Sequence, residues 1–320
     1  MRTAVRQPQM AAGYAAAVLA GGAVGLIWVV QSHVLGLGVI GPAELNWLNV
    51  IGVGLIVWPI VLVRGRGRVI PRGTPVKWLA LFACNAGGIF YFRNVGVGLC
   101  GATTAAVVTR VELVLVFALT YLVLKQRVAP WGWVGAALLI AGVFRVSGVG
   151  SAAMEFNALG IGALVASAVG VAGNALIIKT QFQRVTNELV ILFSATIQTL
   201  IFSLVVPIFV GLDGVRAVLA RPDMIALVAL GAFGIFANLF LYYYAMKRVP
   251  MWSVRMLVLT GPPVAMLADH FILGSPVTAA GVQGLTAVMI GATIVILSGR
   301  ENGKEPGAFA GEGACATIQR

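Results

Sequence analysis

Three ionisable residues stand inside apolar stretches of this chain, where a charge needs a partner. Arg110 and Glu112 lie in TRVELVLVFALTYLVLKQR (109–127), and Arg255 lies in MWSVRMLVLTGPPVAML (251–267). An ionisable group at the centre of a bilayer costs about 2.5–3.5 kcal/mol, so it normally faces a cavity or another polar group. Because guanidinium groups form paired hydrogen bonds with carboxylates and phosphates, the two arginines predict a site for an anionic group.

Glu112 predicts a different role from that of the arginines. Residues two apart on a helix point roughly 200° away from each other, so Arg110 and Glu112 are not expected to neutralise one another. A carboxyl group in a low-dielectric cavity takes up a proton more readily than one in water, which makes Glu112 a candidate proton-coupling site. Structural alternatives stay open: an ion pair to a neighbouring helix for Arg110 or Glu112, and snorkelling of Arg255 to the membrane surface.

Membrane-spanning helices must position these residues. Of the 320 residues, 60% are hydrophobic and 10% are charged, whereas about a quarter of the residues of an ordinary globular domain are charged. Many charge-free runs approach the ~17–25 residues that a spanning helix needs, and helices satisfy their own backbone in lipid. The turn signals between these runs predict an all-α membrane protein with ten transmembrane helices. The expected spans are 13–33, 44–63, 76–96, 101–124, 131–149, 157–178, 188–211, 224–245, 250–273 and 276–298.

The net charge of +12 is explained by topology rather than by nucleic acid, because the basic residues lie mainly in short loops and tails. With both termini in the cytoplasm, sixteen Lys and Arg residues fall on the inner side. Four fall on the outer side, namely Arg93, Arg145, Arg216 and Arg221. This asymmetry predicts a multi-pass protein of the cell (inner) membrane with cytoplasmic termini.

The two halves of the chain are similar to each other. With a constant offset of 149 residues, KQRVAPWGWVGAALLIAGV (125–143) aligns with GSPVTAAGVQGLTAVMIGA (274–292), and three glycines coincide. Each half has five expected spans, an odd number, so the halves must cross the membrane in opposite directions. That arrangement is the inverted repeat of secondary transporters. The predicted organisation is a first repeat at 1–150, a second repeat at 151–298 and a disordered cytoplasmic tail at 299–320.

The second repeat also contains a set of motifs. The first is a Tyr-x-Ala-hydrophobic-Lys segment, Tyr243 to Lys247. The second is a Pro-Val in the ninth expected helix, formed by Pro262 or Pro263 with Val264. The third is Leu273-Gly274, which precedes a glycine-rich tenth helix. Together they resemble the drug/metabolite transporter superfamily, of the two-repeat EamA type. Three positions depart from that family's pattern: Ser275 and Gln126 replace its Glu, and Leu113 replaces its fourth-helix Pro. The resemblance implies a small-solute carrier with a central cavity and alternating access, and it leaves the solute unnamed.

These observations predict a secondary transporter that moves a small polar metabolite, anionic or zwitterionic such as an amino acid, with proton-coupled export left open. The alternative is a cation or multidrug/H⁺ antiporter with Glu112 as the binding acid. No enzymatic activity, cofactor, metal site or nucleic-acid partner is predicted, and a homodimer within the lipid bilayer stays open. Besides Glu112 for proton coupling, the expected substrate-binding residues are Arg110, Arg255, Trp28, Asn85, Tyr91, Asn238 and Tyr242. Helix packing is the alternative for the amide and aromatic residues of this set.

Overall fold

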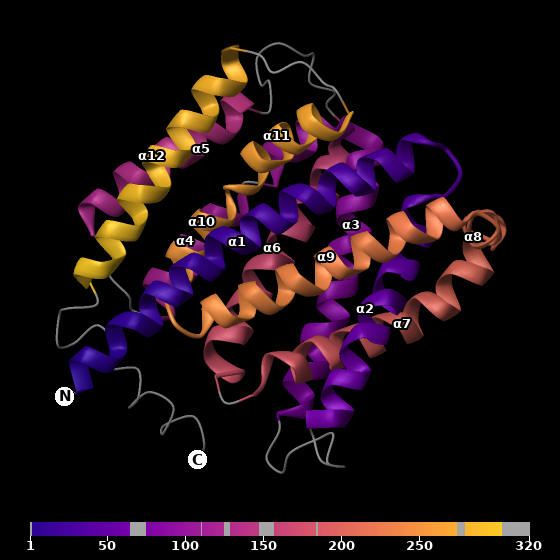
Figure 1. Cartoon of the computed structure of the whole chain (residues 1–320), viewed down its shortest axis with the longest axis horizontal. Helices are drawn as coiled ribbons and strands as arrows, with labels where there is room; N and C mark the ends of the chain where they lie inside the picture. Colours follow the sequence, from indigo (N-terminus) through magenta and orange to yellow (C-terminus); the bar gives the residue numbers. More distant parts are fainter. Residues whose placement is uncertain are drawn as a thin grey trace.

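The computed structural model describes residues 2–64, 75–109, 111–124, 129–146, 157–183, 185–273 and 279–302. Figure 1 shows a bundle of helices, and these ranges contain no strand. The helices are α1 (Arg2–Gly36), α2 (Pro42–Arg64), α3 (Val76–Val108), α4 (Val111–Leu122), α5 (Pro130–Val146), α6 (Ala158–Gln181), α7 (Asn187–Phe209), α8 (Asp213–Leu219), α9 (Pro222–Met246), α10 (Met251–Val258), α11 (Gly261–Leu273) and α12 (Ala279–Asn302).

Many of these helices have the length and composition of membrane spans. Within the described ranges seven are long and apolar enough to cross a membrane: Gln9–Gly36, Pro42–Arg64, Ala158–Gln181, Asn187–Phe209, Pro222–Met246, Met251–Ala268 and Gly281–Ser298. Two shorter apolar helices, Val111–Leu122 and Pro130–Gly142, accompany them. The chain is therefore an all-helical membrane protein, while the number of ten spans stays a prediction.

One expected helix boundary is wrong. The spans 76–96 and 101–124 require a break between them, but α3 continues without interruption to Val108. Residues 95–108 contain neither Pro nor a charged residue, and the helix continues through their three glycines, Gly96, Gly98 and Gly101. The interruption instead comes just before Val111, where α4 begins.

Because of this interruption, Glu112 lies at a different position in its helix from the one expected. The sequence placed Glu112 near the middle of a helix, whereas it lies in the first turn of α4, directly after the break. Its backbone N–H donates to the carbonyl of Thr109 at 3.1 Å, and a carboxylate in a first turn interacts favourably with the helix dipole. The second half has a matching break between Val258, which ends α10, and Gly261, which begins α11. Both halves thus interrupt the corresponding helix.

Helix packing also repeats between the two halves. α1 packs on α9 and α11, and α6 packs correspondingly on α3 and α4. α2 contacts α9, and its counterpart α7 contacts α3. Two pairs, α2 with α7 and α5 with α12, join a helix to its own counterpart in the other half (Figure 1). A two-fold relation between the halves requires this exchange of partners.

The α5–α12 pair shows the direction of that relation. A Cβ atom built on Gly135 would lie 2.9 Å from the carbonyl oxygen of Gly291, and one built on Gly142 would lie 2.8 Å from that of Gly284. The 149-residue offset aligns Gly135 with Gly284 and Gly142 with Gly291, so each contact crosses between counterparts. The two helices therefore run antiparallel with their backbones in close approach, as an inverted repeat requires.

Polar contacts hold both ends of α2. At one end the buried Glu44 carboxylate accepts hydrogen bonds from the backbone N–H groups of Gly41 (2.8 Å) and Gly214 (3.1 Å), the latter in α8. At the other end Arg64, the last residue of α2, forms an ion pair with Glu188 of α7. Glu44 and Glu188 lie in the first turns of α2 and α7, so each helix contributes one acid to these contacts.

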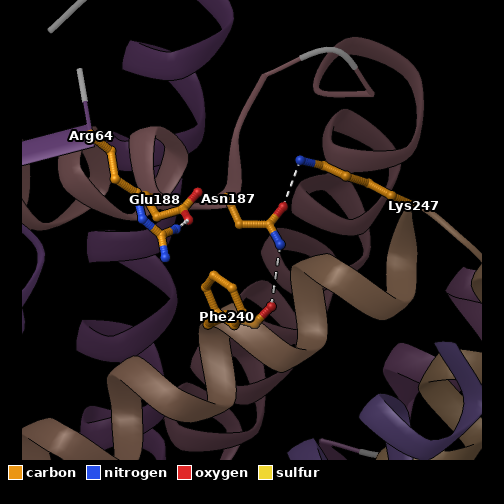
Figure 2. A network of polar contacts seen from close by, with 5 residues as sticks. All are labelled: Arg64, Asn187, Glu188, Phe240 and Lys247. Atoms are coloured by element: carbon orange, nitrogen blue, oxygen red, sulfur yellow. Dashed lines mark hydrogen bonds and ion pairs between the residues drawn. The ribbon is translucent and has the colours of Figure 1, made fainter. Parts of the chain in front are cut away.

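A further group of contacts runs from the start of α7 to the end of α9 (Figure 2). The Asn187 side chain donates to the carbonyl of Phe240 at 3.4 Å and accepts a hydrogen bond of 2.6 Å from Lys247 Nζ. Lys247, which directly follows α9, also donates to the carbonyl of Val185. This lysine therefore links the turn before α7 and the first residue of α7 to the end of α9.

We expect Lys247 to make stability depend on pH. Burial lowers the pKa of Lys247 from 10.5 to about 8; the nearby Glu188 charge opposes this shift, and Arg248 adds to it. Between pH ~8 and ~10.5 the folded protein has lost a proton that the unfolded chain still binds, so stability rises with pH across this window. The thermal midpoint of the purified protein should therefore rise relative to that of Lys247→Met from pH ~8 upward. A midpoint difference that stays constant across the window contradicts the lowered pKa.

Candidate functional site

Arg255 on α10 lies inside the bundle. Its Nη2 donates a hydrogen bond of 3.1 Å to the carbonyl of Val171 on α6, and its guanidinium carbon lies 4.8 Å from the centre of the Tyr242 ring on α9. Its Nε is buried and has no hydrogen-bond partner among the described residues. Arg255 thus engages α6 and α9, and it keeps a donor for another ligand.

Arg93 on α3 is a second guanidinium held within the bundle. It is partly buried, and its Nε, which is fully buried, finds no hydrogen-bond partner in the described part of the chain. Arg93 is close enough to Glu112 and Arg255 to interact electrostatically with both. None of the ion pairs within 4.0 Å that join described residues includes it. An ionisable group at the centre of a bilayer costs about 2.5–3.5 kcal/mol and normally faces a cavity or a polar partner, so Arg93 is a candidate functional residue.

Tyr242 on α9 completes the group. The residue is 8% exposed, and its hydroxyl has no hydrogen-bond partner among the described residues. Tyr242 interacts electrostatically with Arg255 and Glu112. Arg255 lies over the Tyr242 ring, and Glu112 and Arg93 are near enough to interact electrostatically with Arg255 or Tyr242; we name these four residues the charged cluster. They come from α3, α4, α9 and α10, so both halves of the chain contribute two residues each.

The charged cluster has the chemistry of an oxyanion site. With Glu112 ionised, the two guanidiniums leave it with a net charge of +1, and Coulomb interactions are stronger in its low-dielectric surroundings than in water. The two free Nε–H groups and the Tyr242 hydroxyl can donate hydrogen bonds to a carboxylate or a phosphate. Among the described residues no three His, Cys, Asp or Glu side chains could hold a metal ion.

A separate cavity lies between α2, α3, α7 and α9. Its polar lining residues are Asn46, Ser194 and Gln198, and its volume is about 30 Å³. Sites for small organic ligands usually enclose roughly 300–1,000 Å³. This cavity is therefore too small for a metabolite, and the charged cluster is the better candidate for the functional site.

Comparison with known sequences decides the family. The sequence model of the EamA-like transporter family matches the chain twice, over residues 11–148 and 158–297. The chain belongs to the EamA-like transporter family. Its two matches are the two repeats of this family, whose members are transporters rather than enzymes, and its apolar helices make it a multi-pass membrane protein. Comparison with curated proteins found no match.

Solved structures confirm the fold of this EamA-like transporter. One crystal structure, described only as that of a protein, superimposes with a TM-score of 0.72 and 21% sequence identity. The match covers 89% of this chain and 97% of the other. At this identity the comparison shows a shared fold and carries no information on the solute.

Two of the predicted substrate-binding residues of this EamA-like transporter, Asn85 and Tyr91, make their contacts with residues other than those of the charged cluster. Asn85 on α3 donates to the carbonyl of Gly170 and to Oδ1 of Asn174 on α6, both at 2.8 Å. These bonds use both N–H groups of the amide to join two helices, which is a packing role. Tyr91 is 54% exposed and packs edge-on against Phe92, with ring centres 5.8 Å apart. It therefore lies on the outer face of α3.

The remaining predictions are only partly described. Asn238 is partly buried on α9, one helical turn before Tyr242 and so on the same face. Trp28 belongs to α1, and its side chain is not among those described. Arg110 lies outside the described residues. Of the predicted site residues, the structure thus brings together Arg255, Tyr242 and Glu112.

Sequence reasoning missed Arg93. It placed this residue on the outer side, because Arg93 stands near the end of the expected span 76–96. The structure instead continues α3 past it and encloses its guanidinium. One signal was present: the 149-residue offset aligns Arg93 with Tyr242, a predicted site residue.

Proposed function

We propose that this EamA-like transporter is a secondary carrier that moves a small anionic or zwitterionic metabolite by alternating access, with Glu112 as its proton-coupling residue. The single observation that supports the proposal best is the charged cluster, in which two guanidiniums with free donors lie beside one carboxylate. Both halves of the chain supply the cluster, and solute sites in inverted-repeat carriers lie at the junction of the repeats.

The break beside Glu112 supports the same proposal. Interrupted helices in carriers expose backbone groups and helix ends to solutes and coupling ions. Here the break between α3 and α4 and the break between α10 and α11 each adjoin an element that contributes to the charged cluster. We further propose an inner-membrane location with both termini in the cytoplasm, because basic residues concentrate on one expected side.

Counterflow into liposomes tests the solute class. Purified protein is reconstituted into liposomes that are loaded with one solute from a panel of dicarboxylates, amino acids, sugar phosphates and quaternary amines. The radiolabelled form of the same solute is then added outside. We expect an anion or a zwitterion to exchange. Exchange of quaternary amines alone would overturn the proposal in favour of a cation/H⁺ antiporter that uses Glu112 as its binding acid.

Replacing Glu112 with glutamine should separate exchange from coupling. The amide keeps the size of the side chain but cannot gain or lose a proton, so a pH gradient should no longer drive accumulation. Counterflow of the same solute, which needs no net proton movement, should continue. The measurement is uptake with and without an imposed pH gradient.

Asp223→Asn is the matched control for this experiment. Asp223 is an exposed acid at the start of α9 that pairs with Arg221 at 2.9 Å, so its surroundings differ from those of Glu112. Its amide variant should accumulate solute as the wild type does. If Glu112→Gln still accumulates solute under a pH gradient, another group carries the proton and the coupling role of Glu112 is wrong.

A further inference from the structure

Arg93 occupies a defined place beside α6. The hydroxyl of Ser167 on α6 donates to the carbonyl of Ile89 at 3.1 Å, one helical turn before Arg93. A Cβ built on Gly96, almost one turn after Arg93, would lie 2.4 Å from Cγ of Leu164. Arg93 is thus bracketed by two close contacts between α3 and α6, which fix its depth in the bundle.

The same stretch of α6 also holds Arg255. Val171, whose carbonyl accepts the hydrogen bond from Arg255, lies one helical turn after Ser167. Arg93 on α3 and Arg255 on α10 therefore both lie beside one short segment of α6. This placement agrees with the electrostatic influence of Glu112 and Arg255 on Arg93.

In the second repeat the position equivalent to Arg93 holds a residue of a different chemical type. The 149-residue offset aligns Arg93 of α3 with Tyr242 of α9, so the first half supplies a cation where the second supplies a phenol. Arg255 similarly aligns with Ala106, which carries no charge. Each half thus contributes one guanidinium, from non-equivalent positions, and only Glu112 balances them among the described members of the cluster.

We infer that Arg93 is a specificity-determining residue of the solute site, which it makes selective for solutes with a net negative charge, carried as carboxylate or phosphate. This inference rests on the proposed transport function and narrows it. A zwitterion brings no net charge to a cluster with a surplus cation, whereas an anion neutralises it. The buried Nε of Arg93, which lacks a protein partner among the described residues, is the donor offered to that anion.

The stability of the empty protein separates this role from a structural one. Removing one partner of a close buried ion pair is strongly destabilising, whereas Arg93 forms no ion pair within 4.0 Å among the described residues. Arg93→Gln without solute should therefore unfold at or above the wild-type temperature. A clearly lower midpoint for Arg93→Gln indicates a structural ion pair and overturns the inference.

Binding of charged and neutral probe pairs tests selectivity. Thermal shifts of the purified protein are measured with glutamate against glutamine, succinate against succinamide, and glycerol phosphate against glycerol, with Arg93→Gln, Arg93→Lys and the wild type. We expect the wild type to prefer the charged member and Arg93→Gln to lose this preference by about tenfold or more, the loss expected for one charge-assisted hydrogen bond. Arg93→Lys should keep part of it. The first two pairs report carboxylate recognition and the third reports phosphate recognition.

Arg145→Gln is the control with the same change of charge. Arg145 is exposed on α5 and donates to Gln283 Oε1 at 3.0 Å, away from the charged cluster. The Arg145→Gln variant should retain the wild-type preference for the charged member of each probe pair. An unchanged preference in Arg93→Gln, with counterflow intact, overturns the role of Arg93 but leaves the transport function standing. A wild type that exchanges none of the solutes in the counterflow panel overturns the transport function itself.

Discussion

Replacing Gly25 with alanine should destabilise the protein, although alanine is the better helix former. A Cβ at Gly25 on α1 would lie 2.3 Å from the carbonyl oxygen of Gly261 and 2.8 Å from the backbone nitrogen of Ala265 on α11. Both are main-chain atoms, which cannot rotate away as a side chain can. Overpacking costs about 1–3 kcal/mol or more, which exceeds the gain of about 1 kcal/mol from helix propensity. The thermal midpoint in detergent and the fraction of monodisperse protein should both fall.

Gly22→Ala is the matched control on the same helix. The nearest atom to a Cβ at Gly22 is Cγ2 of Val264, at 4.0 Å, which is an ordinary van der Waals distance. This variant should be as stable as the wild type or slightly more stable, because helix propensity then acts without a clash. Equal midpoints for Gly25→Ala and Gly22→Ala would show that α1 does not approach α11 as closely as the structure has it.

The consequence of Gly25→Ala should extend to transport. Gly21, one turn earlier on α1, faces Thr260 in the break between α10 and α11, and the Thr260 hydroxyl donates to the carbonyl of Leu257 at 2.8 Å. Glycines four residues apart let two membrane helices approach closely. α1 thus rests on the break that follows Arg255, so a shift of α1 should displace this part of the site.

The architecture was readable from the sequence because its signals are long. Apolar runs of spanning length, the excess of basic residues in loops and the glycine match between 125–143 and 274–292 each involve many residues. The structure bears out the glycine match directly, since Gly135 meets Gly291 and Gly142 meets Gly284. Among the ionisable residues in apolar runs, the structure places Glu112 and Arg255 in one cluster, and their role in a solute site stays a prediction.

The details that failed depend on contacts between helices. The glycines of the stretch 95–108 favour a boundary locally, but the helix continues there because packing such as that of Gly96 on Leu164 fixes its course. Tyr91 and Arg93 lie two residues apart on α3, and in a helix that is apolar on all sides the sequence does not show which face is buried. Tyr91, which was expected in the site, is exposed on α3, whereas the Nε of Arg93, which was expected at the outer membrane surface, is buried.

Loss of Arg255 should have the largest effect on transport. In Arg255→Gln the site loses a charge together with the free Nε donor that the structure leaves buried and unpaired among the described residues. A hydrogen bond to a charged group contributes about 1.5–3 kcal/mol, so kcat/KM for an anionic solute should fall by roughly 10- to 150-fold. Arg255→Lys should recover part of this loss, because it restores the charge but not the planar pair of donors.

Arg248→Gln is a close control, because its surroundings imitate those of Arg255. Arg248 also lies over a tyrosine of α9, with its guanidinium carbon 3.4 Å from the Tyr244 ring centre, and it also donates to a backbone carbonyl, that of Tyr244 at 3.2 Å. What it lacks is the buried unpaired donor and the neighbouring Glu112. If stacking on α9 were the only role of Arg255, the two variants would lose transport equally. A large loss confined to Arg255→Gln, with both proteins folded, assigns the effect to the charged cluster.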